Sequence, residues 1–120
     1  MPAPVVHFEI GGRDIEKTKA FYGPLFGWEL TAYGPAVMVP PTAPGIGGHL
    51  NCLGHEPHNY VTIYAQVDDL QATLDHAVKL GGKTLIPPQE VPGMGHFAWL
   101  QDPDGNVIGI WQQGPRRAAS

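Results

Sequence analysis

The sequence contains a single cysteine, Cys52, in 120 residues. One thiol cannot form an internal disulfide or a zinc site built on several cysteines, so both are excluded. Charged residues are also scarce, at 15% of the chain, and the formal net charge at pH 7 is −4. A protein that binds nucleic acid needs a basic surface for the phosphates. We therefore expect no nucleic-acid partner.

Long apolar runs are missing as well. A membrane-spanning helix needs about 20 consecutive apolar residues, and no segment approaches that length. The N-terminal residues MPAPVVHFEI have neither the basic start nor the long apolar stretch of a secretion signal. We expect a cytoplasmic protein with no membrane partner, folded as a single domain over residues 1–120 with a frayed tail over 114–120.

An internal repeat is the most informative feature that is present. Residues 6–30 align without a gap with residues 61–85, and six of the aligned pairs are identical, including Asp14 with Asp69 and Gly27 with Gly82. A second alignment, near the end of each half, places His49 on Gly109. The sequence therefore predicts two related modules, over about 4–52 and 59–113.

Each module is predicted to contain one strand, one helix and three further strands. Asp14 and Asp69 precede helical segments, where a carboxylate caps free N–H groups. We expect the first helix to end or kink near Tyr22, because Pro24 removes a backbone donor, and the second to end at Gly81 and Gly82. The predicted strands cover 5–10, 27–32, 36–39 and 45–51 in the first half, and 60–67, 83–86, 96–101 and 107–112 in the second.

The predicted fold is α+β, with two β-α-β-β-β modules whose mixed and antiparallel sheets curl around one cleft and carry the helices outside. Side chains alternate between the two faces of a strand, and this alternation predicts which residues face the helices and which face the cleft. The residues expected to point toward the helices are Val6, Phe8, Ile10, Val61, Ile63 and Ala65. The residues expected in the cleft are His7, Glu9, His49, Asn51, Thr62, Tyr64, Gly109 and Trp111, with Trp99 as a further candidate.

Four motifs together resemble the vicinal oxygen chelate superfamily, also called the glyoxalase/bleomycin resistance protein/dioxygenase superfamily. They are VHFEI, KAFYGPLFGWEL, VDDLQATLDHAVKLGGK and FAWLQDPDGNVIGIWQ, in this order from His7 to Gln112. The resemblance implies paired β-α-β-β-β modules, a concave site for a small molecule and a homodimer. It also implies a divalent metal in many members and metal-free binding in others.

In the members that use a metal, the resemblance places the four ligands at His7, His49, Thr62 and Gly109 of this sequence. Two of these positions carry histidine, but a threonine is a weak neutral donor and a glycine has no side chain. Catalytic zinc and iron sites commonly have three protein ligands. We therefore expect no cofactor. The alternative is a divalent ion such as zinc, nickel, iron, manganese or cobalt held by His7 and His49, with Glu9 as a possible third ligand.

Two functions stay open at this point, and the sequence does not decide whether the protein is an enzyme. The first is metal-free binding of a small molecule, with Tyr64, Trp99 and Trp111 as apolar walls and His7, Glu9, His49, Asn51 and Thr62 as polar contacts. The second is an enzyme of the glyoxalase, lyase or isomerase type, in which His7 and His49 anchor a metal or His7 and Glu9 transfer protons without one.

Overall fold

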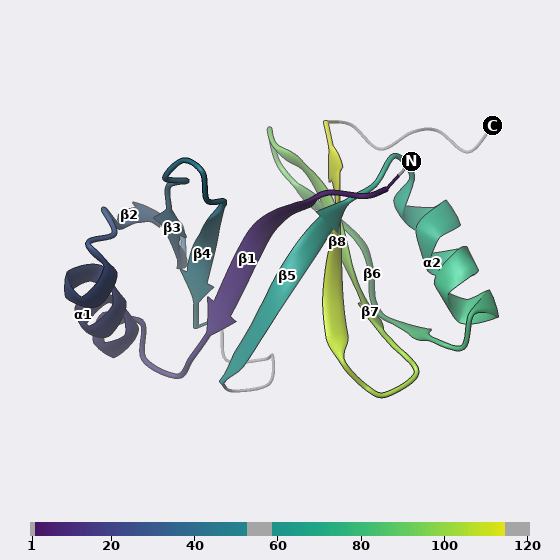
Figure 1. Cartoon of the computed structure of the whole chain (residues 1–120), viewed down its shortest axis with the longest axis horizontal. Coiled ribbons are helices and arrows are strands. Elements are labelled where there is room, and N and C mark those ends of the chain that lie inside the picture. Colours follow the sequence, from purple (N-terminus) through teal and green to yellow (C-terminus); the bar gives the residue numbers. More distant parts are fainter. Residues whose placement is uncertain (1, 53–58, 115–120) are drawn as a thin grey trace. The chain divides into compact units, whose positions relative to one another are not determined.

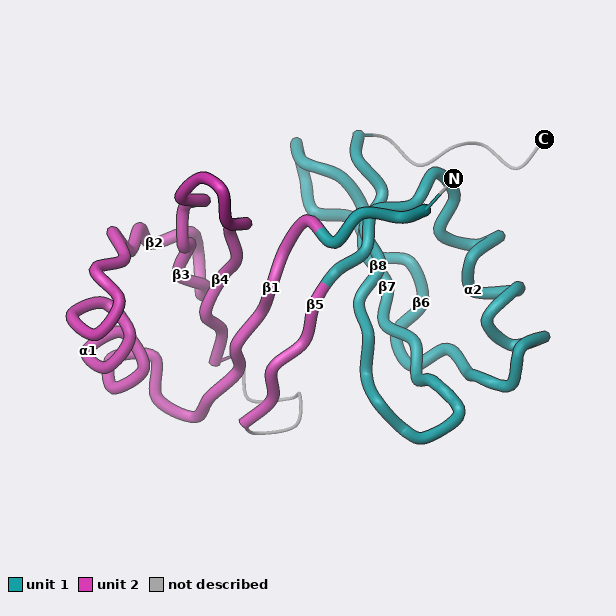
Figure 2. Tube along the Cα trace, viewed as in Figure 1, with its two compact units in different colours: residues 1–5, 64–120 teal, residues 6–63 magenta. Residues whose placement is uncertain are grey.

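A computed structural model describes residues 2–52 and 59–114. The chain forms two compact units, shown in Figure 2. Unit 1 comprises Met1–Val5 and Tyr64–Ser120, and unit 2 comprises Val6–Ile63. The division passes through a strand of the second predicted module, and the first residues of the chain belong to unit 1. Of the predicted tail, only Gly114 lies within the described residues.

Unit 2 contains the first β-α-β-β-β succession (Figure 1). Its elements are β1 (Val5–Gly11, of which Val6–Gly11 lie in this unit), α1 (Ile15–Phe26), β2 (Thr31–Tyr33), β3 (Ala36–Val39) and β4 (Gly47–Asn51). The strands lie in the order β2-β3-β4-β1. The β1–β4 pair is parallel and the other two pairs are antiparallel.

Unit 1 repeats this succession. Its elements are β5 (Tyr60–Gln66, of which Tyr64–Gln66 lie in this unit), α2 (Leu70–Lys79), β6 (Lys83–Val91), β7 (Gly95–Gln101) and β8 (Val107–Gln113). The strands lie in the order β5-β8-β7-β6. The β5–β8 pair is parallel, whereas β7 is antiparallel to both of its neighbours. The prediction of an α+β protein with two β-α-β-β-β modules is confirmed.

The strand register agrees with both alignments of the repeat. Glu9 of β1 is paired with His49 of β4, and Tyr64 of β5 is paired with Gly109 of β8. Glu9 and Tyr64 are aligned in the first repeat alignment, and His49 and Gly109 in the second. The two modules thus have equivalent residues at equivalent places in their parallel strand pairs.

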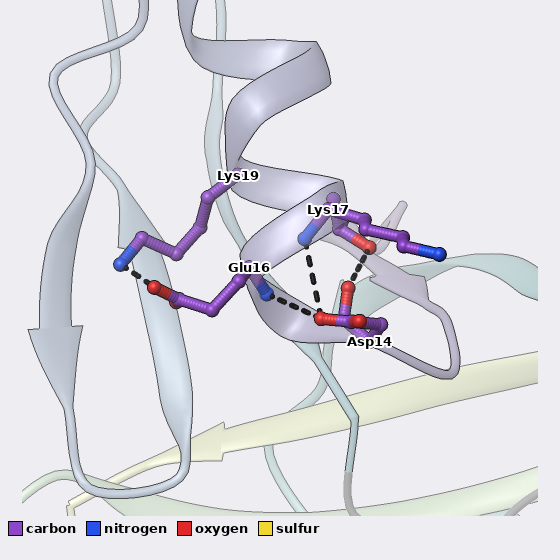
Figure 3. A network of polar contacts seen from close by, with 5 residues as sticks. Asp14, Glu16, Lys17 and Lys19 are labelled. Carbon is purple, nitrogen blue, oxygen red and sulfur yellow. Dashed lines mark hydrogen bonds and ion pairs between the residues drawn. The ribbon is translucent and has the colours of Figure 1, made fainter.

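Aspartates cap both helices as predicted. The side chain of Asp14 accepts hydrogen bonds from the backbone N–H groups of Glu16 and Lys17, at 3.0 and 3.3 Å (Figure 3). Asp69 accepts one from the N–H of Ala72 at 3.0 Å. These bonds satisfy donors that have no partner inside the helix, which explains why each helix begins where it does.

The first helix was predicted to end or kink near Tyr22, and an end at that residue is wrong. Helix α1 continues through Pro24 to Phe26 and ends at Gly27, whose φ of 69° is the left-handed conformation that glycine adopts without steric cost. The N–H of Gly27 reaches the carbonyl of Gly23. Because Pro24 lies in the last turn, its missing N–H removes a single bond at the end of the helix and leaves the rest intact.

Each unit has its own apolar core between a helix and the strands. In unit 2 the core consists of Val37, Val39 and Leu50, with Phe8, Ile10, Ile15, Tyr22, Trp28 and Leu30 packed against it. In unit 1 it consists of Leu70, Leu74, Ala98 and Ile110, with Val67 and Leu100 packed against it. The described helices include none long and apolar enough to cross a bilayer.

Some residues expected in these cores lie outside them. Val61 and Ile63 were expected to point toward a helix, but 71% and 39% of their surfaces are exposed. They lie in the part of β5 that belongs to unit 2, whereas α2 packs on strands of unit 1. Apolar side chains are exposed in α1 as well: Leu25 and Phe26, at its end, are more than half exposed, whereas Ile15 and Tyr22, which pack against the core, lie earlier in the helix.

Two strands differ from the prediction by more than two residues at one end. The segment predicted as a strand over 27–32 is a strand only as β2, over Thr31–Tyr33. Trp28 and Leu30, which precede this strand, pack against the core of unit 2. The segment 83–86 is the start of a longer strand, β6, that includes Pro87 and Pro88. This strand lies at the edge of the sheet and its pairing is irregular there, which is where proline is tolerated.

The core of unit 1 provides a test of the helix register. Leu74 of α2 is fully buried, whereas Val78, one turn later, is 54% exposed. We expect Leu74→Ala to lower the free energy of unfolding by about 2–5 kcal/mol, because it leaves a cavity. The matched variant Val78→Ala should change it by about 0.5 kcal/mol or less. Urea unfolding followed by circular dichroism measures both, and equal effects would contradict the register.

Candidate functional site

Unit 2 gathers five polar side chains on the face of its strands opposite the helix. They are His7 and Glu9 of β1, His49 and Asn51 of β4, and Tyr60 at the start of β5, here called the polar cluster. The parallel pairing of β1 with β4 sets Glu9 beside His49. Because alternate residues of a strand share a face, His7 and Asn51 lie on the same side as these two.

Glu9 is the centre of the polar cluster and is only 3% exposed. Its Oε2 atom accepts hydrogen bonds from the hydroxyl of Tyr60 and from Nδ2 of Asn51, the latter at 3.3 Å. Its Oε1 atom lies 3.3 Å from Nε2 of His49. A buried carboxylate is stable only when donors surround it, and these three side chains supply them.

His7 extends the cluster through His49. Nε2 of His7 lies 2.7 Å from Nδ1 of His49, so a single proton occupies the space between the two rings and either ring can carry it. Burial is the main cause that lowers the pKa of His7 to about 4, and the charge of His49 lowers it too, against an opposing effect of Glu9. His7 is therefore a neutral imidazole at physiological pH.

Tyr60 is a member of the cluster that the sequence analysis missed. The signal was available, because Tyr60 alternates with Thr62 and Tyr64, both of which were assigned to the same face of that strand. Thr62 is buried on this face as expected, with 4% of its surface exposed. Asn51 is also buried, at 8% exposed, and its Oδ1 atom has no hydrogen-bond partner among the described residues.

The corresponding face of unit 1 is aromatic. Tyr64 and Trp99 are each 5% exposed, and Nε1 of Trp99 donates a hydrogen bond of 2.7 Å to the hydroxyl of Tyr64. Phe97, which the sequence analysis did not single out, packs edge-on against Tyr64 and is paired across the strands with Trp111. Trp111 is partly exposed, and its Nε1 donates to the side chain of Gln113.

The four positions that the resemblance assigns to metal ligands do not supply four donors. Gly109 has no side chain, and the ring of Tyr64 fills the space that its Cβ would need. His7 and His49 point nitrogen atoms at each other, and the second nitrogen of His49 faces Glu9. Across residues 2–52 and 59–114, no group of three or more His, Cys, Asp or Glu side chains is arranged to hold a metal ion. The residues present do not fit the four-ligand site.

Of the eight residues predicted to line a binding site, the structure therefore brings together four in unit 2, His7, Glu9, His49 and Asn51. Tyr64, Trp99 and Trp111 lie on the strands of unit 1, where the first two are in direct contact. Whether any of these side chains contacts a ligand stays a prediction.

The family profile of the glyoxalase/bleomycin resistance protein/dioxygenase superfamily matches residues 5–110. The chain belongs to this superfamily. A relative from Streptomyces peucetius, the anthracycline biosynthesis protein DnrV, is 24% identical over 145 aligned residues, which cover 98% of this chain and 50% of DnrV. A glyoxylase-like domain-containing protein from Didymella fabae is 32% identical over 114 residues, which cover 85% of this chain and 88% of that protein. The chain thus spans about half the length of DnrV.

A solved structure supports the same fold. A superfamily member from Vibrio splendidus 12B01 superposes with a TM-score of 0.65 at 18% identity, covering 93% of this chain and 99% of that one. The resemblance drawn from the four sequence motifs and the predicted fold class are both confirmed. At this identity the likeness shows the fold alone.

The neutral state of His7 gives a pH prediction. Because its pKa in the folded protein lies below the ordinary 6.5, protons bind more readily to the unfolded chain, and stability falls as the pH drops from about 6.5 toward 4. We expect the ring signals of His7 to titrate with a midpoint near pH 4 in an NMR experiment. In His49→Gln the midpoint should rise, since one cause of the lowering is gone. A midpoint at 6.5 in the unaltered protein would contradict the buried contact with His49.

Proposed function

We propose that this protein binds a small, uncharged organic molecule at the polar cluster of unit 2, without a resident metal ion. The observation that supports it is that the side chains able to bind a metal ion are already bonded to one another. His7, His49 and Glu9 are engaged with one another, and the donors that surround Glu9 are supplied by the chain itself. Proteins hold small ligands through a few convergent polar groups of this kind.

The relatives support an aromatic, hydroxyl-bearing ligand. DnrV of Streptomyces peucetius and DauV of Streptomyces sp. strain C5 are both described as anthracycline biosynthesis proteins. Anthracyclines have a planar anthraquinone ring system that carries phenolic hydroxyl groups. The superfamily name also includes resistance to bleomycin, another small molecule. A homodimer and a cytoplasmic location stay predictions from the sequence.

Binding can be measured with anthraflavic acid, an anthraquinone with two free phenols, by calorimetry on protein treated with EDTA. We expect saturable binding that EDTA does not change, because no metal takes part. His49→Gln should weaken binding about tenfold, the effect of roughly 1.4 kcal/mol from one altered polar contact. The control His76→Gln, on the exposed surface of α2, should bind as the unaltered protein does.

Two results would count against this proposal. One is binding that disappears with EDTA and returns with stoichiometric zinc, nickel, iron, manganese or cobalt, which would indicate a metal site. The other is an affinity that is the same in His49→Gln and in the unaltered protein, which would place the ligand away from the polar cluster.

A second candidate function is proton transfer without a metal, in an isomerase or lyase. It is favoured by one observation, the contact of His7 with His49 and of His49 with Glu9, because a chain of this kind moves a proton between the two rings while the carboxylate orients His49. His7 is the end of this chain farther from Glu9. It is neutral, and so able to accept a proton, at any pH well above about 4.

Exchange of carbon-bound hydrogen for deuterium, followed by NMR in D₂O with a panel of small ketones and thioesters, tests this second function. We expect Glu9→Gln to reduce exchange by about 10²–10⁴-fold, because His49 loses the charge that orients it, while ligand binding is largely kept. The rate should rise with pH through about 4. If no compound in the panel exchanges above the uncatalysed rate, the chain acts as a binding protein and the first function stands.

A further inference from the structure

An unsatisfied oxygen in the polar cluster indicates what kind of ligand the site selects. Asn51 is more than nine-tenths buried, and its Oδ1 atom has no partner among the described residues. Two other polar atoms of this residue have partners. Its Nδ2 donates to Glu9, and its backbone carbonyl accepts a hydrogen bond of 3.0 Å from the N–H of Gly12. A buried acceptor without a donor is unfavourable, because it has lost its hydrogen bonds to water.

The orientation of the Asn51 amide is fixed by Glu9. The Oε2 atom of Glu9 also accepts from the hydroxyl of Tyr60, so it lies between two donors. Rotating the amide by half a turn would bring Oδ1 against this carboxylate oxygen and replace an attraction by a repulsion. Exchanging the positions of nitrogen and oxygen therefore does not give the side-chain oxygen a hydrogen bond. Oδ1 stays the atom that needs a donor.

We propose that Asn51 is a specificity-determining residue that accepts a hydrogen bond from a hydroxyl or N–H group of the ligand. This inference rests on the proposed binding function and narrows it to a ligand class. A ligand whose polar group is an ether or ketone cannot donate to Oδ1. A carboxylate or phosphate cannot donate either, and it would also approach the charge of Glu9. An uncharged phenol meets both requirements.

The position of Asn51 places a ligand that donates to it next to the other residues of the polar cluster. It lies two residues after His49 on the same face of β4, so a donor that reaches Oδ1 enters the polar cluster beside that ring. Binding of such a ligand should therefore change the NMR signals of both side chains together. A molecule that binds elsewhere on unit 2 would leave the Asn51 amide unaffected.

Three small probes separate these cases: phenol, its methyl ether anisole, and benzoate. We expect phenol to bind about tenfold more tightly than anisole and benzoate to bind least, with titrations followed by ¹⁵N NMR. The tenfold difference in affinity between phenol and anisole corresponds to one hydrogen bond accepted by Oδ1 of Asn51. Phenol should shift the side-chain amide signals of Asn51 and the ring signals of His49 in the unaltered protein. This readout needs no variant.

Asn51→Leu removes the acceptor while it keeps a side chain of similar size. In this variant phenol and anisole should bind within about twofold of each other, because neither gains a hydrogen bond. The control Gln71→Leu removes an exposed amide on α2 and should keep the tenfold preference.

The outcomes separate the proposed role of Asn51 from the proposed binding of a small molecule at the polar cluster. If phenol and anisole bind equally and shift His49 without shifting the Asn51 amide, the role of Asn51 is wrong and binding at the cluster stands. If neither these probes nor anthraflavic acid shifts any signal of the cluster, both proposals are wrong.

Discussion

A buried negative charge organises unit 2. Glu9 is almost completely removed from water, and an ionised carboxylate in such a place is unfavourable unless several donors reach it. The donors come from the end of β4 and from the start of β5, so the carboxylate of β1 joins side chains of two other strands. Of the residues proposed to contact a ligand, His49 and Asn51 are bonded directly to that carboxylate.

The two units show how a duplicated module diverges. Glu9 and Tyr64 occupy equivalent positions in the parallel strand pairs, as do His49 and Gly109. In unit 2 these positions hold ionisable groups that are bonded to each other. In unit 1 an aromatic ring lies over a glycine, and its hydroxyl is bonded to Trp99. The backbone pattern is the same, but one face offers polar contacts and the other offers apolar area for van der Waals contact.

Much of the fold could be predicted because local rules and the repeat agreed. The aspartate caps, the alternation along β1 and the internal repeat were sufficient for the order of elements. The strand pairs Glu9–His49 and Tyr64–Gly109 agree with the repeat alignments, but those alignments do not say which strands pair. Alternation also placed His7, Glu9, His49 and Asn51 on one face. The contacts within that group, such as the one between His7 and His49, depend on the twist and spacing of two strands that the sequence does not specify.

The errors in the prediction have a common physical origin. Pro24 does not end α1 because a proline near the last turn interrupts only one hydrogen bond. Val61 and Ile63 have the alternation of core residues but lie exposed, because periodicity identifies a face of a strand and says nothing about what packs on it. Propensity and period describe a segment by itself, whereas these outcomes depend on neighbours distant in the chain.

The packing of Tyr64 over Gly109 also restricts how this sequence can evolve. A donor side chain at position 109 would collide with the ring, so that replacement alone destabilises unit 1 before it confers any new chemistry. Shrinking Tyr64 first would open a void and remove the hydroxyl to which Trp99 donates. A mutational route toward a metal-binding site must therefore pass through a variant of lower folding stability, whichever of the two substitutions arises first.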